Sequence, residues 1–369
     1  MFIDKRTNLV KVNFIPWLDQ AVKNDHYLWE DVRLMASFMQ EMGHDTKLFN
    51  SIDLSIKLHG GDGLFSMQGD GGQEVYDCDL LFVHPMPPVR FGGKMTKFDK
   101  DSMQAIRNTN GKVLLFHNDS YMFGAMKSAA RSKWGEYALD FPFIFASSNL
   151  ANRTDQLGDT VKGLCGGRQI TLNQTWTNGY DWIQKKGGVP RLDHVRPKAD
   201  FFYGGVLRHN EFRKTFLGLM EEFGRESFWS YGAMAREYGL VDAVKENYGR
   251  SKVGRKELIE LTSQCRFSLL PYDRNKDYIT TKALENGMSN SLVLADERYA
   301  TEGLKFETLN LQDTDAVRHY LEMDEDERLD LVDKQHKMLD AFDFKSKAKR
   351  QVDDLERLVI TGEYPEESA

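Results

Sequence analysis

Short apolar runs alternate with helical stretches along the first half of the chain. Continuous apolar runs bounded by polar residues are typical of strands buried on both faces of a parallel sheet. They predict strands at Leu9–Ile15 (ended by Pro16), Thr46–Phe49, Leu80–Val83, Val113–Phe116 and Phe143–Ala146. Between the first two, apolar residues recur with helical spacing and stop at Gly43, which predicts a helix over Trp29–Met42.

The alternation resumes in the second half, beginning with the run Asp200–Tyr203. Further strands are predicted at Ser227–Tyr231, Phe267–Leu270 and Leu292–Ala295, and helices at Glu211–Phe223, Lys256–Gln264 and Thr280–Met288. Helical periodicity then continues from Ala316 to about Leu358, and Gly362–Ala369 is expected to fray. This order of elements predicts an α/β fold.

Two domains are expected because 369 residues exceed what one hydrophobic core usually organises. The charged, turn-rich stretch from Gln184 to Pro197 is the candidate linker. The predicted division is an N-terminal doubly wound domain at 1–190, a second at 191–345, and a C-terminal helix with a frayed tail at 346–369. The two domains are expected to face each other across a cleft, with ligands beyond the carboxyl ends of the strands.

The composition excludes several classes of protein. No apolar run approaches the roughly 20 residues of a membrane span. The N-terminal residues Met1–Arg6 lack the apolar core of a signal peptide. The three cysteines are widely spaced and fit reduced, buried thiols, so we expect a cytoplasmic protein.

Positive charge is concentrated in one segment of an acidic chain. The net charge is −7, yet Arg90–Trp134 has nine Lys or Arg residues against three Asp. This basic segment is a candidate contact for a nucleic-acid backbone, with Arg90, Lys94, Lys127, Arg131 and Lys133 as the substrate-binding candidates. Ordinary solvated lysines would give the same count, and the sequence leaves both interpretations open.

The segment Tyr278–Gly287 suggests half of a nucleotide-sugar site. Lys282 and Glu285 are three residues apart at the start of a predicted helix, so they share a face. A lysine near a helix start suits a diphosphate, and a carboxylate can accept hydrogen bonds from two ribose hydroxyls. The simpler alternative is an exposed helix face with an ion pair.

A second candidate for the same site follows the strand at Asp200–Tyr203. The pair Gly204-Gly205 would let the backbone approach a ligand, and Arg208 and Arg213 could bind phosphate oxygens. Such a glycine pair also occurs in ordinary tight turns.

Asp119 is the candidate acid/base residue, because it follows the strand Val113–Phe116 at the expected cleft edge. An Asx turn is the alternative role. Glu30 and Asp31 open the first helix, where they could orient an acceptor or simply cap the helix. No metal-ligating residue is assigned, and the motifs HExxH, GxxxxGK[ST] and GxSxG are absent from the sequence.

Taken together, these blocks resemble the bacteriophage DNA β-glucosyltransferase family, which modifies hydroxymethylated bases in phage DNA. The resemblance is spread over most of the chain. It is carried by Gln40–Gly43, Arg90–Lys94, Phe202–Gly205 with Arg208, and Tyr278–Thr280 with Lys282 and Glu285.

The resemblance implies the GT-B fold of two Rossmann-like domains, inversion at the sugar, UDP-glucose as donor, and DNA binding mainly through the N-terminal domain. It also implies that Gly205, Arg208 and Lys282 contact the diphosphate and that Glu285 holds the ribose. Asp119 would be the catalytic base, and Asp31 or Glu30 would touch the sugar or acceptor.

The chain departs from the family pattern at several positions. The family's second arginine corresponds to Phe212, with Arg213 one residue further, and the arginine of the Tyr-Ile-Thr block is Lys282. The segment Pro271–Lys276 is shorter than the family's and lies where the donor sugar is expected. Asp273 in this segment is a further donor-binding candidate. The loop around Asp119 carries an extra residue.

The expected function is transfer of a sugar from a UDP-sugar to a 5-hydroxymethyl-pyrimidine in double-stranded DNA, with Mg²⁺ as an optional aid to the departing diphosphate. Two alternatives remain open. One is a GT-B glycosyltransferase acting on a surface glycan or small molecule, and the other is a non-catalytic nucleotide-sugar or DNA-binding protein.

Overall fold

The computed structural model describes residues 10–16, 27–48, 76–84, 109–117, 143–147, 169–205, 210–250, 254–272, 278–299 and 301–363. Backbone contacts group the chain into two compact units. One comprises Met1–Asn178 with Lys345–Ala369, and the other comprises Gly179–Phe344. The predicted division at 190 and 345 stays a prediction; these units place the last helix with the N-terminal residues.

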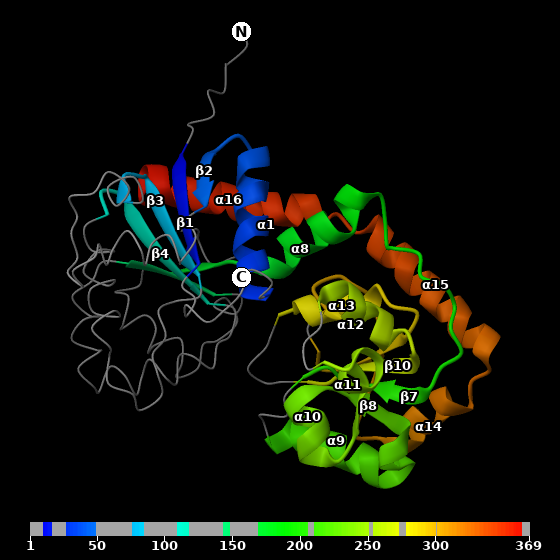
Figure 1. Ribbon diagram of the computed structural model, residues 1–369. Coiled ribbons are helices and arrows are strands. Elements are labelled where there is room, and N and C mark those ends of the chain that lie inside the picture. Colours follow the sequence, from blue (N-terminus) through cyan, green and yellow to red (C-terminus); the bar gives the residue numbers. More distant parts are fainter. Residues whose placement is uncertain are drawn as a thin grey trace. The chain divides into compact units, whose positions relative to one another are not determined.

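The described residues of the first unit form a parallel sheet in the order β2-β1-β3-β4-β5-β6 (Figure 1). Its strands are β1 (Lys11–Pro16), β2 (Asp45–Leu48), β3 (Leu80–His84), β4 (Lys112–His117), β5 (Phe143–Ser147) and β6 (Gln169–Thr171). Helix α1 (Tyr27–Glu41) packs against β1 and β2, and α8 (Gln174–Trp182) follows β6. Helix α16 (Phe344–Thr361) is tied to β4, because the Lys112 ammonium donates to the carbonyls of Leu358 (2.8 Å) and Val359 (2.6 Å).

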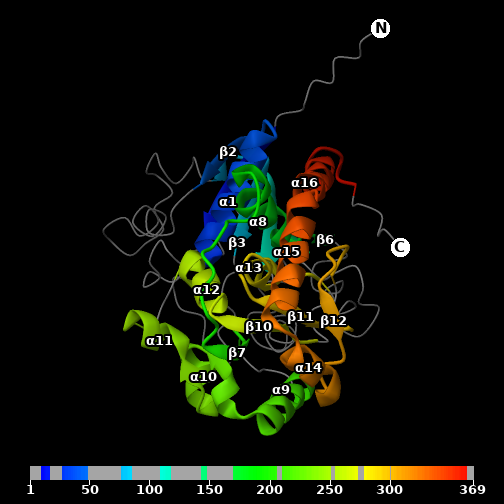
Figure 2. The same cartoon turned by 90° about the vertical axis from the view of Figure 1, so that its right-hand side faces the viewer.

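The second unit contains another parallel sheet, in the order β12-β11-β10-β7-β8-β9 (Figure 2). Its strands are β7 (Ala199–Phe202), β8 (Phe228–Ser230), β9 (Val241–Asp242), β10 (Cys265–Leu270), β11 (Leu292–Asp296) and β12 (Glu307–Leu309). Its helices are α9 (Asn210–Phe223), α10 (Gly232–Tyr238), α11 (Ala243–Tyr248), α12 (Arg255–Thr262), α13 (Thr281–Gly287), α14 (Thr314–Glu322) and α15 (Glu325–Ala341).

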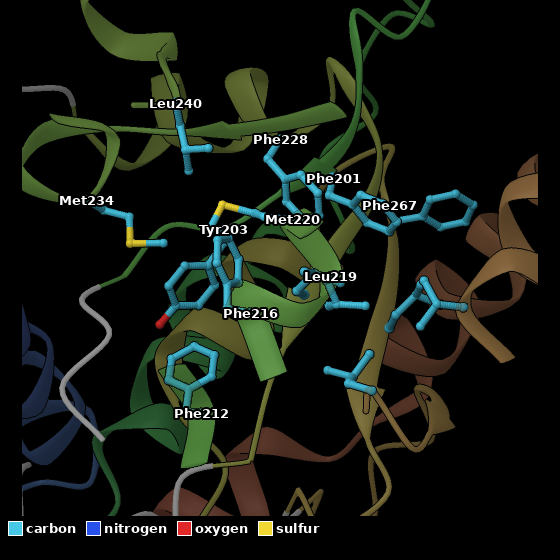
Figure 3. Packing of buried hydrophobic residues seen from close by; sticks show 14 of the residues in the cluster. Phe201, Tyr203, Phe212, Phe216, Leu219, Met220, Phe228, Met234, Leu240 and Phe267 are labelled. Atoms are coloured by element: carbon cyan, nitrogen blue, oxygen red, sulfur yellow. The ribbon is translucent and has the colours of Figure 1, made fainter. Parts of the chain in front are cut away.

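Strand alternation divides the core of the second unit between two faces of the sheet. Phe201 belongs to the cluster with Phe228, Phe267 and side chains of α9, whereas its neighbour Phe202 belongs to the cluster with Trp229. Figure 3 shows the first cluster, in which the α9 side chains pack on the strand residues. Both faces are therefore apolar, which explains the continuous apolar runs in these strands.

The described elements confirm the predicted strands and helices, with each end within two residues of the predicted position. The helical periodicity predicted from Ala316 to about Leu358 is confirmed, and the structure divides this stretch into three helices, α14, α15 and α16. Asp324 ends the first by capping the next, since its side chain accepts from the Glu327 amide at 2.8 Å. Phe342 ends the second with an extended backbone (φ −77°, ψ 132°).

Several shorter elements were not predicted: β6, α8, α10, β9, α11 and β12. Helix α8 escapes the apolar pattern because its polar residues are themselves buried. Gln174, Thr177 and Asn178 are all at most 2% exposed. None of the helices in the described part of the chain combines the length and apolarity that a membrane crossing requires. The glycine-rich stretch at 60–72 and the tail beyond residue 363 lie outside the described residues.

Candidate functional site

The strand order of the second sheet locates its ligand-binding edge. In chain order the sheet reads 6-5-4-1-2-3, so the direction of winding reverses between β7 and β10, which pair directly. Ligands of doubly wound sheets bind outside the carboxyl ends of the strands at this switch point. Here β7 is followed by Tyr203-Gly204-Gly205, and β10 by Pro271-Tyr272. The predicted glycine pair therefore lies at this edge of the sheet.

Tyr203 is fixed in the core immediately before the glycine pair. Its ring lies edge-on to Phe212 (centroids 5.0 Å apart) and 5.3 Å from Phe216, both on α9. Its backbone carbonyl accepts a hydrogen bond from the Ser230 hydroxyl at 2.7 Å. Because Tyr203 is only 4% exposed and held on several sides, it can act as a rigid support at the strand end.

Helix α13 brings Lys282 to this support. The Lys282 ammonium lies 4.9 Å from the centroid of the Tyr203 ring, within the range of a cation–π interaction. A Cβ atom added at Gly205 would lie 2.5 Å from the same ammonium and would also collide with the Tyr203 hydroxyl. The structure thus brings together Gly205 and Lys282, two residues that the sequence places far apart but assigns to one phosphate site.

The turn before α13 is held by side chains that follow β11. The Tyr299 hydroxyl accepts from the Thr280 amide (3.1 Å) and shares a hydrogen bond with the Thr280 hydroxyl (2.8 Å). The Glu302 carboxylate accepts from the Ile279 amide at 3.0 Å. Burial raises the pKa of Tyr299 to about 12, so its hydroxyl keeps its proton at neutral pH. These bonds fix the position from which Lys282 extends.

Glu285 lies one turn further along α13 and contacts a cation from another helix. Its Oε1 is 3.8 Å from Nε of Arg255, the first residue of α12. The Arg255 guanidinium in turn stacks 3.4 Å from the centroid of the Trp182 ring. Sequence spacing could not reveal this arrangement, because Arg255 meets Glu285 and Trp182 only through the packing of separate elements.

A second unpredicted cluster lies at the carboxyl ends of β10 and β11. The buried Asp296 carboxylate accepts two hydrogen bonds from the Arg298 guanidinium, at 2.8 and 3.1 Å. The Arg298 guanidinium lies 4.6 Å from the centroid of the Tyr272 ring. This cluster anchors Tyr272, the last described residue before the segment that contains Asp273.

Among the described residues, the contacts that Arg213 makes are with helix α10, and not with Lys282 or Gly205. Its guanidinium lies 3.8 Å from the Glu237 carboxylate and 5.7 Å from the centroid of the Tyr238 ring, both on α10. Its neighbour Phe212 faces the core, where it packs on Tyr203. A phosphate contact by Arg213 remains a prediction, and these contacts do not favour it.

The two acids at the start of α1 differ in their surroundings. The Glu30 side chain is 30% exposed and lies 3.9 Å from Arg33. Asp31 is buried; its carboxylate accepts from the Asn178 amide at 3.1 Å, and its carbonyl accepts from the Gln174 amide at 3.0 Å. Asp31 therefore links α1 to α8, and Glu30 is the better placed of the two to meet an acceptor.

The other predicted site residues lie outside the described residues. Strand β4 ends at His117, two positions before Asp119 in the sequence, and the role of Asp119 stays a prediction. The residues not described are Asp119, Arg208, Asp273, Arg90, Lys94, Lys127, Arg131 and Lys133.

A separate cavity of about 660 Å³ lies in the first unit, at the amino ends of β1, β3 and β4, with Lys11, Asp79 and Lys112 among its lining residues. It is therefore at the edge opposite to the one that binds ligands in this kind of sheet. Within the described ranges, no group of three or more His, Cys, Asp or Glu side chains is arranged to hold a metal ion.

Solved structures share this architecture over nearly the whole chain. A DNA modifying enzyme, β-glucosyltransferase, studied with and without uridine diphosphoglucose, matches at a TM-score of 0.63 and 15% identity, covering 95% of this chain and 100% of its own. T4 phage BGT in complex with UDP and Mn²⁺ matches with the same TM-score and identity, covering 95% and 99%. A T4 phage BGT mutant with UDP-glucose has a TM-score of 0.64 at 16% identity, with 95% and 99% covered.

The chain has the fold of these enzymes. The predicted α/β class with two doubly wound parallel sheets, typical of GT-B glycosyltransferases, is confirmed. No protein-family model and no curated protein matches the sequence. At this level of identity the likeness establishes the fold alone.

Proposed function

We propose that this protein is an inverting glycosyltransferase that moves a sugar from a UDP-sugar to a 5-hydroxymethyl-pyrimidine in double-stranded DNA. The observation that carries the proposal is the position of Lys282 beside Gly205 at the switch point of the second sheet. A cation at this edge, next to a strand end without a side chain, suits the diphosphate of a nucleotide sugar. Similar structures contain UDP or UDP-glucose.

The donor would be held by residues of the second unit. Gly205 would let the backbone approach the diphosphate, Lys282 and Arg208 would neutralise its charge, and Glu285 would accept hydrogen bonds from the ribose hydroxyls. Asp273, in the segment after Tyr272, is proposed to contact the sugar. Mg²⁺ is usually held by one or two carboxylates together with substrate phosphates, so a divalent cation would be bound mainly by the donor itself.

The acceptor would be held by the first unit. The basic segment Arg90–Trp134 would bind the DNA backbone, mainly through Arg90, Lys94, Lys127, Arg131 and Lys133. A base within a duplex has to be flipped out before an enzyme can act on it. The solvent-accessible Glu30 is proposed to orient the extruded base or the sugar. The proposal includes a cytoplasmic location, where the protein would meet DNA directly.

The chemical step is a single displacement at the anomeric carbon. The hydroxymethyl oxygen attacks the face opposite the diphosphate, the bond from this carbon to the phosphate oxygen breaks, and UDP departs with the electron pair. Asp119 takes the proton that the hydroxyl loses as the new bond forms. Lys282 and Arg208 stabilise the charge that develops on the departing diphosphate.

The test is to incubate the protein with UDP-sugars and duplex DNA containing 5-hydroxymethylcytosine or 5-hydroxymethyluracil, then to weigh the digested nucleosides. We expect one hydroxymethylated nucleoside to gain the mass of one sugar, and an unmodified duplex of the same sequence to gain none. Hydrolysis of the UDP-sugar to UDP and free sugar, or sugar transfer to a glycan without DNA, would favour a different acceptor. Donor binding without any transfer would indicate a non-catalytic protein.

A further inference from the structure

Arg255 occupies a defined position at the start of α12. The helix begins at Arg255, and the Glu257 carboxylate accepts from the Gly254 amide at 2.9 Å, which fixes the first turn. Helices α12 and α13 pack against each other. The Arg255 side chain is 19% exposed and therefore points largely into the structure. The fixed first turn of α12 therefore sets the direction in which the Arg255 side chain leaves the helix.

Trp182 gives the Arg255 guanidinium a flat support. The guanidinium carbon lies 3.4 Å from the centroid of the indole ring, the distance of direct stacking. Trp182 is only 3% exposed, so the ring is held by its surroundings. Stacking on an aromatic face orients the planar guanidinium and leaves its N–H edge available for a carboxylate.

The Glu285 carboxylate faces this edge, with its Oε1 3.8 Å from Nε of Arg255. The Glu285 side chain is 21% exposed, so it is partly covered while still reaching solvent. A glutamate on a short helix has several rotamers, and fixing them costs free energy when a ligand binds. A stacked arginine beside the carboxylate removes part of that cost in advance.

We propose that Arg255, supported by Trp182, is a positioning residue that holds the Glu285 carboxylate for the ribose hydroxyls and so makes the site select ribonucleotide over 2′-deoxyribonucleotide donors. This inference rests on the proposed function. A carboxylate held in place binds two neighbouring hydroxyls together. A donor that lacks the 2′-hydroxyl leaves one carboxylate oxygen of Glu285 without a hydrogen-bond donor. A partly buried polar group left unpaired in this way discriminates strongly against the donor that lacks the hydroxyl.

The test compares binding of UDP and 2′-deoxy-UDP by calorimetry. We expect the wild-type protein to prefer UDP by about 10- to 100-fold, the value of one hydrogen bond to a charged group. Arg255→Met keeps a long side chain on Trp182 but loses the charge, and should reduce this preference toward that of Glu285→Gln. Arg255→Lys keeps the charge without the planar stack and should give an intermediate preference.

Arg318→Met is the matched control, because Arg318 forms an ion pair with Glu222 between α14 and α9. It should leave the preference unchanged, and melting temperatures should show that all variants are folded. An unchanged preference in both Arg255 variants would overturn the positioning role, while the proposed function would stand. A wild-type protein that binds neither nucleotide would overturn the proposed function and this inference together.

Discussion

The Lys282 ammonium lies 4.9 Å from the centroid of the Tyr203 ring, although the two residues belong to different elements on either side of the switch point. Tyr203 is anchored by Phe212 and Phe216, and the turn before Lys282 is anchored by Tyr299. A flexible lysine is thereby confined to a small region beside Gly205. Confinement of this kind lowers the entropic cost of binding an anion.

Lys282→Ala and Glu285→Ala should each weaken UDP binding while leaving the fold intact. Both side chains are partly exposed at the binding edge, so their loss empties no core position. The loss of a hydrogen bond to a charged group costs about 1.5–3 kcal/mol. Calorimetry with UDP measures the effect, and unchanged affinity in both variants would show that the nucleotide binds elsewhere.

Gly205→Ala should displace Lys282. The new methyl group would lie 2.5 Å from the Lys282 ammonium and would collide with the Tyr203 hydroxyl. Tyr203 is held by the core, so both the flexible lysine and the backbone at position 205 have to move, and we expect UDP affinity to fall by about tenfold or more.

Gly218→Ala is the matched control for this substitution, because a Cβ atom at Gly218 meets nothing within 4 Å. Gly218 lies within α9, where alanine favours the helix by about 0.5–1 kcal/mol. The control should therefore bind UDP normally and melt at the same or a higher temperature. Equal UDP affinity in the two variants would contradict the role given to Gly205.

Arg328→Met should destabilise the protein strongly. Arg328 is 1% exposed and donates to the Glu325 carboxylate at 2.7 and 2.9 Å and to the carbonyls of Arg266 and Asn290. Its loss leaves the carbonyls of Arg266 and Asn290 without this donor, which typically costs about 1–3 kcal/mol for each group left unsatisfied. The exposed Arg357, paired with Asp354, is a control, and Arg357→Met should change stability by less than about 0.5 kcal/mol.

The stability that Arg328 contributes should also depend on pH. Its hydrogen bonds lower the pKa of Glu325 below the ordinary value of 4.5. A carboxyl group whose pKa is lowered by folding stabilises the folded state above that ordinary value, and loses this effect as the pH falls through the lowered pKa. The difference in unfolding free energy between wild type and Arg328→Met should therefore shrink below pH 4.5. A difference that stays constant down to pH 3 would contradict this account.

The sequence was informative where burial leaves an apolar pattern and silent where polar groups are buried together. Runs such as Phe267–Leu270 are apolar because both faces of the sheet are covered, so they predicted strands correctly. Helix α8 buries Gln174, Thr177 and Asn178 in mutual hydrogen bonds, and such a helix has no apolar stripe to recognise.

The candidate site shows the same limit. Lys282 and Glu285 could be selected because a helix start and a spacing of three residues are local features. Arg255 and Trp182 could not, because the contacts of Arg255 with Glu285 and with Trp182 depend on how α12, α13 and α8 pack. Phe212 stands where the resemblance places an arginine, and only the packing on Tyr203 shows that this side chain serves the core.

DNA binding should depend steeply on salt despite the net charge of −7. The basic segment Arg90–Trp134 would release counterions from the DNA as it binds, so affinity falls with rising salt. Neutralising Lys127, Arg131 and Lys133 together should flatten the slope of log affinity against log salt. Replacing Lys334, Lys337 and Lys345 instead gives a control of equal charge change. Equal slopes in the two triple variants would place the DNA elsewhere or favour an acceptor that is not DNA.

Asp119→Ala tests the chemistry itself. If Asp119 is the base, the variant should bind UDP and DNA nearly as well as wild type while the single-turnover rate falls by about 10²–10⁴-fold, the usual effect of losing a positioned proton acceptor. If Asp119 only caps a turn, the variant should lose about 0.5–2 kcal/mol of stability and keep its rate per folded molecule. Melting temperature and single-turnover rate measured on one preparation distinguish the two. A lowered melting temperature with an unchanged rate would move the search for the base to Glu30, whose side chain reaches solvent, because Asp31 is already hydrogen-bonded to Asn178.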